Sequence, residues 1–218
     1  MARRPTNAWE SLRLTDRIAP GVRVLFVGIN PGVRSAETGH HFAGPSNRFW
    51  KLLFESGLVP EPITFEQDTR LPEFGYGITN IIARPSPGID VLKPAEYVAG
   101  WHILEQKIDR FRPEILALVG VTVFRAVLPF LAEPARLKPR PTPATARLKP
   151  RPTAAKATLK RRPTSEATIG LQPYSVHGAR VFVLPNPSGR NANFSYAEML
   201  EAFRSLYVES RRRRRARA

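Results

Sequence analysis

Apolar runs that end at glycine, asparagine or proline alternate along this chain with segments whose apolar residues have helical spacing. Residues 22–29 (VRVLFVGI) form a short β-branched run that is typical of a buried parallel strand. Residues 47–56 place apolar side chains on one helical face, and Gly57 follows as a stop signal. The alternation predicts an α/β fold with three layers and a mainly parallel sheet. Further strands are predicted at 76–82, 114–119 and 179–184, and further helices at 97–110, 121–131 and 195–209.

The chain has 218 residues, 42% of them hydrophobic, which is enough for one sizeable core. We predict one domain over residues 21–208, preceded by an N-terminal extension over 1–20. The lack of cysteine excludes disulfides, thiolate zinc sites and iron–sulfur clusters, and we expect neither a metal nor a cofactor. No apolar run approaches the roughly 20 residues of a membrane helix, and the first residues lack the apolar stretch of a signal peptide. We therefore expect a soluble cytoplasmic monomer, associated with the bacterial nucleoid and not with a membrane.

The net charge of +16 is concentrated in two segments. Residues 135–167 hold ten lysines and arginines against one glutamate, and residues 211–218 add six arginines. The rest of the chain carries only about one positive charge. The high isoelectric point therefore says little about the surface of the folded part.

Residues 135–167 consist of three consecutive eleven-residue repeats, ARLKPRPTPAT, ARLKPRPTAAK and ATLKRRPTSEA. Proline in each copy forbids a continuous helix, and few apolar residues offset the entropy of ordering, so we predict a disordered insertion. Two interpretations stay open: a tether that contacts DNA phosphates without reading sequence, or an expanded repeat tolerated in a surface loop. The arginine-rich tail at 209–218 is likewise either a solvated end or a phosphate-binding arm.

Two polar loops directly follow predicted strands. The first is GINPG at residues 28–32, whose glycines allow close backbone approach to a ligand and whose Asn30 offers a short amide side chain. The second is LPNPSGRN at residues 184–191. Ligands of parallel sheets bind beyond the carboxyl ends of the strands, where both loops are expected to lie. Taken alone, each loop is more typical of a structural turn than of a catalytic site.

Considered in order, GINPG, GHHF-x-GP-x-N-x-FWK, a G-x-TN strand, GLQP and LPNPSG resemble the mismatch-specific uracil and thymine DNA glycosylases of the uracil-DNA glycosylase superfamily. The resemblance covers most of residues 22–134 and 168–208. It implies a three-layer αβα sandwich with a mainly parallel, four-stranded sheet. It also implies a monofunctional repair enzyme that hydrolyses the N-glycosidic bond of uracil mispaired with guanine in double-stranded DNA. Ethenocytosine and, more weakly, thymine in a G:T mismatch are the further substrates that it suggests, and the product is an abasic site for base excision repair.

By this resemblance, Asn30 matches the residue that positions the water attacking C1′ of the flipped nucleotide. An amide is too weak a base to deprotonate water early, so the glycosidic bond should break largely before water adds. The base then leaves as an anion, and backbone N–H groups around Ile29 and Phe42 are expected to hold its oxygens. Gly28, at the start of the same loop, belongs to the same expected pocket.

The resemblance assigns five more features to this base pocket. Phe42 matches the aromatic residue that stacks on the extruded base, with core packing as the alternative. His41 could polarise the base or contact phosphate, and a structural or exposed imidazole is equally compatible with the sequence. Asn80 matches a position that hydrogen-bonds the base edge, and Ser86 a position with a hydroxyl near the pocket. Ser35 matches the residue facing C5 of the base, where serine is typical of the bacterial uracil-type members, which puts thymine removal in doubt.

In the second loop, Ser188 and Gly189 match residues that pinch the phosphate backbone. Arg190 matches the wedge that enters the base stack, and arginine there resembles the thymine-type enzymes. Asn191 either contacts the opposite guanine through its amide or only shapes the loop. Asn186 stands where the uracil glycosylases with a GQDPYH loop open their second motif with histidine.

Features that the sequence lacks narrow the function further. No lysine and aspartate pair of the helix-hairpin-helix kind is present, so we expect no β-elimination lyase activity. Two other functions are compatible with the charge: a non-catalytic basic DNA-binding protein on the same scaffold, and an architectural protein that acts through its repeats and tail. The Asn30 loop and the Arg190 loop argue against the first of these.

Overall fold

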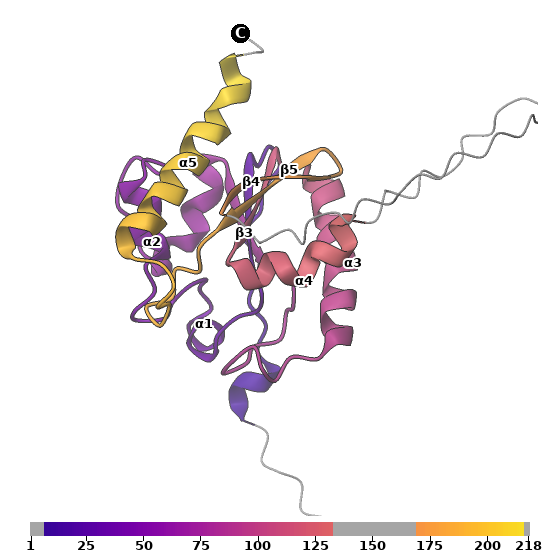
Figure 1. Ribbon diagram of the computed structural model, residues 1–218. Helices are drawn as coiled ribbons and strands as arrows, with labels where there is room; N and C mark the ends of the chain where they lie inside the picture. Colours follow the sequence, from indigo (N-terminus) through magenta and orange to yellow (C-terminus); the bar gives the residue numbers. More distant parts are fainter. Residues whose placement is uncertain (1–6, 133–168, 216–218) are drawn as a thin grey trace, which may run out of the picture.

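The computed structural model describes residues 7–132 and 169–215, and these form a sheet of five strands between two helical layers (Figure 1). The strands are β1 (Val24–Gly28), β2 (Tyr76–Asn80), β3 (Ile115–Val119), β4 (Gly170–Val176) and β5 (Ala179–Leu184). Their order is β2-β1-β3-β5-β4, and all neighbours are parallel except β4 and β5. The predicted α/β sandwich with a mainly parallel sheet is confirmed, whereas the predicted number of four strands is wrong by one.

Helices cover both faces of the sheet, and every residue of β1 and β3 is therefore buried. One layer consists of α2 (Phe49–Glu55), the 3-10 helix η2 (Phe65–Phe74) and α5 (Tyr196–Arg215). The other layer consists of α3 (Pro94–Phe111) and α4 (Val121–Ala132). Each face of the sheet has its own apolar core, built around Phe26 and Phe49 on the first side and around Leu25 and Trp101 on the second. Two short elements, η1 (Ala8–Ser11) and α1 (Val33–Thr38), complete the fold.

The additional strand β4 lies at one edge of the sheet. It contains Pro173, which cannot donate a backbone hydrogen bond and is tolerated in strands mainly at edges. Only two of its residues are buried, so the segment lacks the continuous apolar run by which the other strands are predicted. The register with β5 is also interrupted between Leu171 and Ser175. An edge position therefore explains why the sequence pattern does not reveal this strand.

Helix α5 continues to Arg215, whereas the pattern predicts its end at residue 209. No glycine or proline follows Glu209, and arginine is a good helix former. Positive charge is also favourable at the carboxyl end of a helix. The first arginines of the predicted tail are therefore helical. The predicted disordered insertion at 135–167 lies outside the described residues.

The carboxyl ends of the parallel strands bring the two polar loops together. The loop after β1 and the loop after β5 lie at this edge, and the backbone N–H of Arg48 donates to the Pro187 carbonyl at 2.9 Å. The start of α2 is thereby joined to the second loop. Among residues 7–132 and 169–215, none of the helices has both the length and the apolar character needed to cross a bilayer.

Candidate active site

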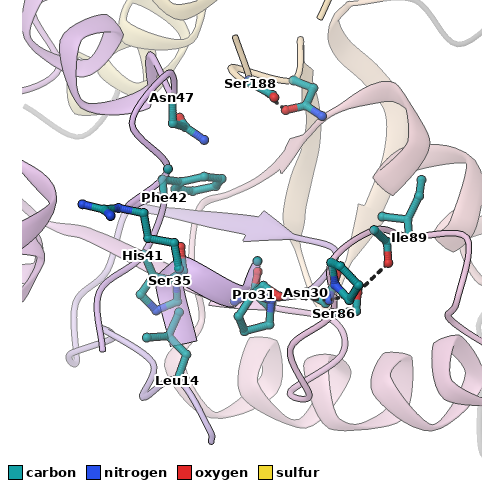
Figure 2. Close-up of a pocket in the computed structure, with 17 residues that line it drawn as sticks. Leu14, Asn30, Pro31, Ser35, His41, Phe42, Asn47, Ser86, Ile89 and Ser188 are labelled. Carbon is teal, nitrogen blue, oxygen red and sulfur yellow. Dashed lines mark hydrogen bonds between the residues drawn. The ribbon is translucent and has the colours of Figure 1, made fainter. Parts of the chain in front are cut away.

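A cavity of about 290 Å³ opens at the carboxyl edge of the sheet (Figure 2). Its walls come from the loop after β1, the loop at 41–47, the segment after β2 and the loop after β5. Figure 2 shows Asn30 and Ser86 on one side and Phe42, His41 and Ser35 on the other. Most of the predicted site residues line this cavity: Asn30, Ser35, His41, Phe42, Asn80, Ser86, Asn186 and Ser188.

The two ends of the Asn30 side-chain amide have different surroundings. Its Nδ2 donates to the backbone oxygens of Pro31 (3.0 Å) and Arg84 (3.3 Å) and to Ser86 Oγ (2.7 Å). Backbone carbonyls only accept hydrogen bonds, so the nitrogen and not the oxygen must occupy this position. Asn30 Oδ1 has no partner among the described residues, and the residue lines the cavity. Asn30 therefore offers an acceptor that can orient a water molecule.

Ser86 is buried, and its hydroxyl donates to the Gly88 carbonyl at 2.5 Å. Because this proton is engaged, the Ser86 oxygen serves as the acceptor for Asn30. The segment is anchored by Arg84, whose guanidinium contacts the Glu96 carboxylate of α3 through two hydrogen bonds of 2.6 and 2.9 Å. The hydrogen bonds from Arg84 lower the pKa of Glu96 to about 2. The anchor therefore stays ionised at any pH at which the protein would be assayed.

Phe42 forms a platform at the wall of the cavity. Its ring stacks on Phe49 with centroids 4.3 Å apart and planes 25° apart, so one face rests on the core. The backbone of Phe42 has a φ of 52°, which is unusual for a residue with a bulky side chain. The ring is half-buried and lines the cavity. Phe42 therefore packs against the core with one face of its ring and also lines the pocket.

His41, next to Phe42, is only 2% exposed and is bonded at three points. Its backbone N–H donates to Asp68 Oδ2 (2.9 Å), and its carbonyl accepts from Trp50 Nε1 (3.1 Å). Its ring Nε2 lies 3.1 Å from the Thr15 carbonyl, which requires Nε2 to carry a proton. Burial lowers the pKa of His41 below 6.5, so the ring is neutral at pH 7. His41 is therefore not an exposed imidazole. Because its ring is neutral, it does not supply a positive charge for a DNA phosphate.

Ala43, on the other side of Phe42, is held in the same way. Its backbone N–H donates to Ser35 Oγ (3.1 Å), and its carbonyl accepts from Arg34 Nε (2.8 Å). Side chains therefore satisfy the backbone polar groups of both residues that flank Phe42. No hydrogen bond joins the backbone N–H of Phe42 to the described part of the chain. Within the described residues, this N–H is therefore a donor without a partner.

Gly28 permits the position of Asn80 at the floor of the site. A Cβ atom at residue 28 would lie 2.5 Å from Asn80 Oδ1 and 3.8 Å from Phe42 Cζ. The amide of Asn80 has no side-chain hydrogen bond with the described residues and lines the cavity, so it is free to bond a base edge. Ile29 does not line the cavity; its carbonyl accepts from the Ile82 N–H at 2.8 Å.

Side chains of the second loop form hydrogen bonds with the backbone of the same loop. Asn186 Oδ1 accepts from the Ser188 N–H (3.0 Å), and Ser188 Oγ accepts from the Arg190 N–H (3.3 Å). Asn191 Nδ2 donates to the Asn186 carbonyl (2.8 Å), and its Oδ1 accepts from the Asn193 N–H (2.9 Å). Both ends of the Asn191 amide are thus engaged within the loop. Its loop-shaping interpretation is the one that these contacts favour.

Gly189 and Arg190 form the outer part of this loop. A Cβ atom at residue 189 would lie 2.5 Å from Ser46 Cβ and 2.7 Å from the Ser46 carbonyl oxygen, so glycine is required for this close approach. Arg190 is exposed, and its side chain makes no hydrogen bond or ion pair with the described residues. Two residues after Ser188, which lines the cavity, the chain thus presents an exposed guanidinium.

The order of the motifs and the geometry at the strand ends agree with the comparison to known families. A family model for the uracil DNA glycosylase superfamily matches residues 15–207. The chain belongs to this superfamily. Membership supports a DNA glycosylase, that is a hydrolase of base excision repair, and it supports DNA as the partner. In this glycosylase, no group of three or more histidine, aspartate or glutamate residues in the described ranges is arranged to hold a metal ion.

Several contacts that shape the glycosylase site could not be predicted from the sequence. Asp68 and Trp50 fix His41, Arg34 fixes Ala43, and Glu96 anchors Arg84. Asp68 and Glu96 lie in helices far along the chain from GINPG, and their role appears only when the fold brings them to the loops. Trp50 belongs to the FWK motif and Arg34 follows GINPG, but their side-chain hydrogen bonds to backbone carbonyls could not be read from spacing.

Proposed function

We propose that this glycosylase is monofunctional and removes uracil mispaired with guanine from double-stranded DNA, leaving an abasic site. The observation that carries the proposal is the fixed orientation of Asn30, whose amino end is bonded and whose Oδ1 is free at the cavity. An acceptor in this place orients a water molecule toward C1′ of a flipped nucleotide without removing its proton first.

In the reaction that we propose, the bond between C1′ and the base nitrogen breaks with both electrons going to the base. The sugar becomes an oxocarbenium-like cation, and water held by Asn30 Oδ1 adds to C1′. The added water then releases one proton to the solvent, and the base anion takes up one proton from the solvent. The free N–H of Phe42 stabilises the departing anion, since a fixed donor aimed at developing charge lowers the barrier. Asn80 bonds the base edge, and Phe42 supplies the stacking surface.

The preference for uracil follows from Ser35. Its side chain is 7% exposed, and its oxygen accepts from the Ala43 N–H, so it occupies a fixed position in the pocket wall. If Ser35 faces C5 of the base, the methyl group of thymine crowds against it, and thymine is removed more slowly than uracil. Ethenocytosine, which is altered at its Watson–Crick edge and not at C5, is the second proposed substrate. Arg190 would fill the space that the extruded base leaves.

The test is alkaline cleavage of labelled duplexes that contain G:U, G:T, A:U or G:ethenocytosine. We expect strand cleavage to be fastest for G:U and slowest for G:T. Asn30→Ala should lower the single-turnover rate by at least about a hundredfold, whereas Asn193→Ala, which changes an exposed asparagine just after the second loop, should leave it unchanged. The enzyme proposal fails if stoichiometric protein forms no abasic product from any duplex. Binding without product would instead support a non-catalytic DNA-binding module.

A further inference from the structure

Asp68 is a fully buried carboxylate that no motif includes. It lies in η2 with 0% exposure and receives three hydrogen bonds, one from Arg17 and two from the consecutive residues His40 and His41. Its Oδ1 accepts from Arg17 Nε (3.0 Å) and lies 3.1 Å from His40 Nδ1. Its Oδ2 accepts from the backbone N–H of His41 at 2.9 Å. The two oxygens thus have different roles: one is held by side chains, and the other fixes the peptide just before Phe42.

The location of this contact matters because Phe42 adopts a left-handed backbone conformation. Residues other than glycine adopt a φ near 52° only where surrounding contacts impose it. Asp68 and Trp50 bond the two backbone groups of His41 on one side of the turn, and Ser35 bonds the N–H of Ala43 on the other. The N–H of Phe42 is left without a partner in the described chain.

We propose that Asp68 is a positioning residue of the glycosylase reaction, which fixes the turn at Phe42 so that the Phe42 N–H meets the departing base. The inference rests on the proposed function, because it concerns the anion that leaves in that reaction. Arg17 and His40 both bond the other carboxylate oxygen, Oδ1, which restrains the position of Asp68 beside the turn. A donor fixed before the reaction stabilises developing charge more than one that must reorient.

The inference makes a prediction about leaving groups. Uracil leaves as a less stable anion than 5-fluorouracil, so its departure depends more on a donor that stabilises negative charge. Asp68→Asn keeps the size of the side chain but replaces one of the two acceptor oxygens by an amino group. The one remaining oxygen cannot take the place of both carboxylate oxygens, which accept separately from Arg17 and from His41. We expect the single-turnover rate for G:U to fall about tenfold or more. This loss is smaller than the roughly hundredfold loss that follows when a backbone-type donor to a developing anion is removed entirely. The rate for G:5-fluorouracil should fall at least about threefold less.

Two controls separate positioning from general damage to the fold. Glu73→Gln changes an exposed carboxylate in the same helix and should alter neither rate. Affinity for a duplex with an uncleavable 2′-fluoro nucleotide should stay within about twofold for Asp68→Asn, because the catalytic donor acts mainly in the transition state. His40→Ala removes the imidazole donor to Oδ1 and leaves the bond to His41 intact, so it should show the same leaving-group pattern with a smaller loss.

Three results are informative. A larger loss for uracil than for 5-fluorouracil in both variants supports the inference. Equal losses for the two bases, or no loss, overturn it while the wild-type activity still supports the proposed function. Absence of product from the wild-type protein on both duplexes rejects the proposed function itself. If Asp68→Asn does not fold, as judged by its thermal transition, His40→Ala decides the question alone.

Discussion

At the scale of single residues, the orientation of one amide determines the chemistry of the site. Asn30 has its amino end among three acceptors, of which two are backbone carbonyls and the third is Ser86 Oγ. The Ser86 proton is itself used by the Gly88 carbonyl. The serine therefore acts as a one-way acceptor that keeps Asn30 Oδ1 turned toward the cavity. In the proposed mechanism Asn30 orients water, and the hydrogen bond to Ser86 fixes the orientation of Asn30.

Replacing Ser86 by alanine should slow base excision without abolishing it. The change removes the shortest of the three Asn30 contacts but leaves both carbonyls, so the amide keeps its preferred orientation with more freedom. A hydrogen bond of this kind contributes about 1 kcal/mol, which corresponds to roughly a fivefold loss in the single-turnover rate. Ser86→Thr, which keeps the hydroxyl, should restore most of the rate, and Ser205→Ala on the exposed face of α5 should have none of the effect. An unchanged rate in Ser86→Ala would show that the carbonyls alone suffice.

His41 makes the stability of the fold depend on pH. Burial lowers the pKa of the folded-state imidazole below 6.5, so below that pH the unfolded chain binds a proton that the folded protein does not. The contribution of His41 to stability is therefore complete above about pH 6.5 and is lost as the pH falls toward its lower folded-state pKa. His41→Gln can still donate to the Thr15 carbonyl but does not titrate. Between pH 7.5 and 5.5 the urea midpoint should fall more for wild type than for His41→Gln, and parallel midpoints would contradict this assignment.

At the scale of elements, the site depends on how two loops meet. The loop after β5 touches the loop at 41–47 through Gly189 and Ser46, and the start of α2 bonds the Pro187 carbonyl. Neither loop forms the cavity alone, since the walls include residues after β1, after β2 and after β5. Contact between these loops fixes the second loop, which carries Arg190, relative to the pocket.

Gly189→Ala should separate these loops. The new Cβ would lie 2.7 Å from the Ser46 carbonyl oxygen, a backbone atom that cannot rotate away, so the second loop must shift. We expect the Kd for a G:U duplex, measured by fluorescence anisotropy, to rise about tenfold because Ser188 and Arg190 move relative to the DNA. The thermal transition should change little, as this loop lies at the surface. An unaltered Kd would show that the loop adapts without loss of contact.

Elements were predictable from the sequence where burial is two-sided and continuous. The segments of β1 and β3 are fully buried and read as apolar runs, and helices α2 to α5 follow their apolar spacing. The edge strand β4 and the short elements η1, α1 and η2 have no such pattern, because few of their residues face the core. The site follows the same rule: Asn30 and Phe42 lie in contiguous motifs, whereas Asp68 reaches its partners only through the tertiary fold.

At the scale of the whole molecule, the chain enters β4 and leaves α5 toward opposite edges of the sheet. Helix α5 begins after the second loop at the carboxyl edge and runs back, so that Glu209 bonds Arg180 near the start of β5. Its 20 residues span about 30 Å, and Figure 1 shows its end beyond the rest of the fold. The chain returns from residues 135–167 at Gly170, which pairs with Val183 close to the carboxyl edge. The described chain therefore resumes nearer the carboxyl edge of the sheet, whereas α5 ends toward the opposite edge.

This arrangement predicts different effects for two deletions. A lesion duplex of about 20 base pairs bound at the carboxyl edge is too stiff to bend around to the opposite edge, because its persistence length is about 150 base pairs. Deleting residues 213–218 should leave both the excision rate and the salt dependence of Kd unchanged on such a duplex. Deleting residues 135–167 should also leave the single-turnover rate unchanged, but it should reduce the slope of log Kd against log salt, since each lost phosphate contact lowers that slope by about 0.9.

The same deletions decide between a repair enzyme and an architectural protein. An enzyme whose chemistry resides at Asn30 keeps base excision when both basic segments are removed, because the cavity is built entirely from residues outside them. A protein whose function resides in the repeats and the arginine run loses DNA binding in the double deletion and shows no excision in any form. If deleting 135–167 leaves the salt slope unchanged, the repeats are an expanded surface loop, and the +16 charge of the chain has no part in holding the lesion.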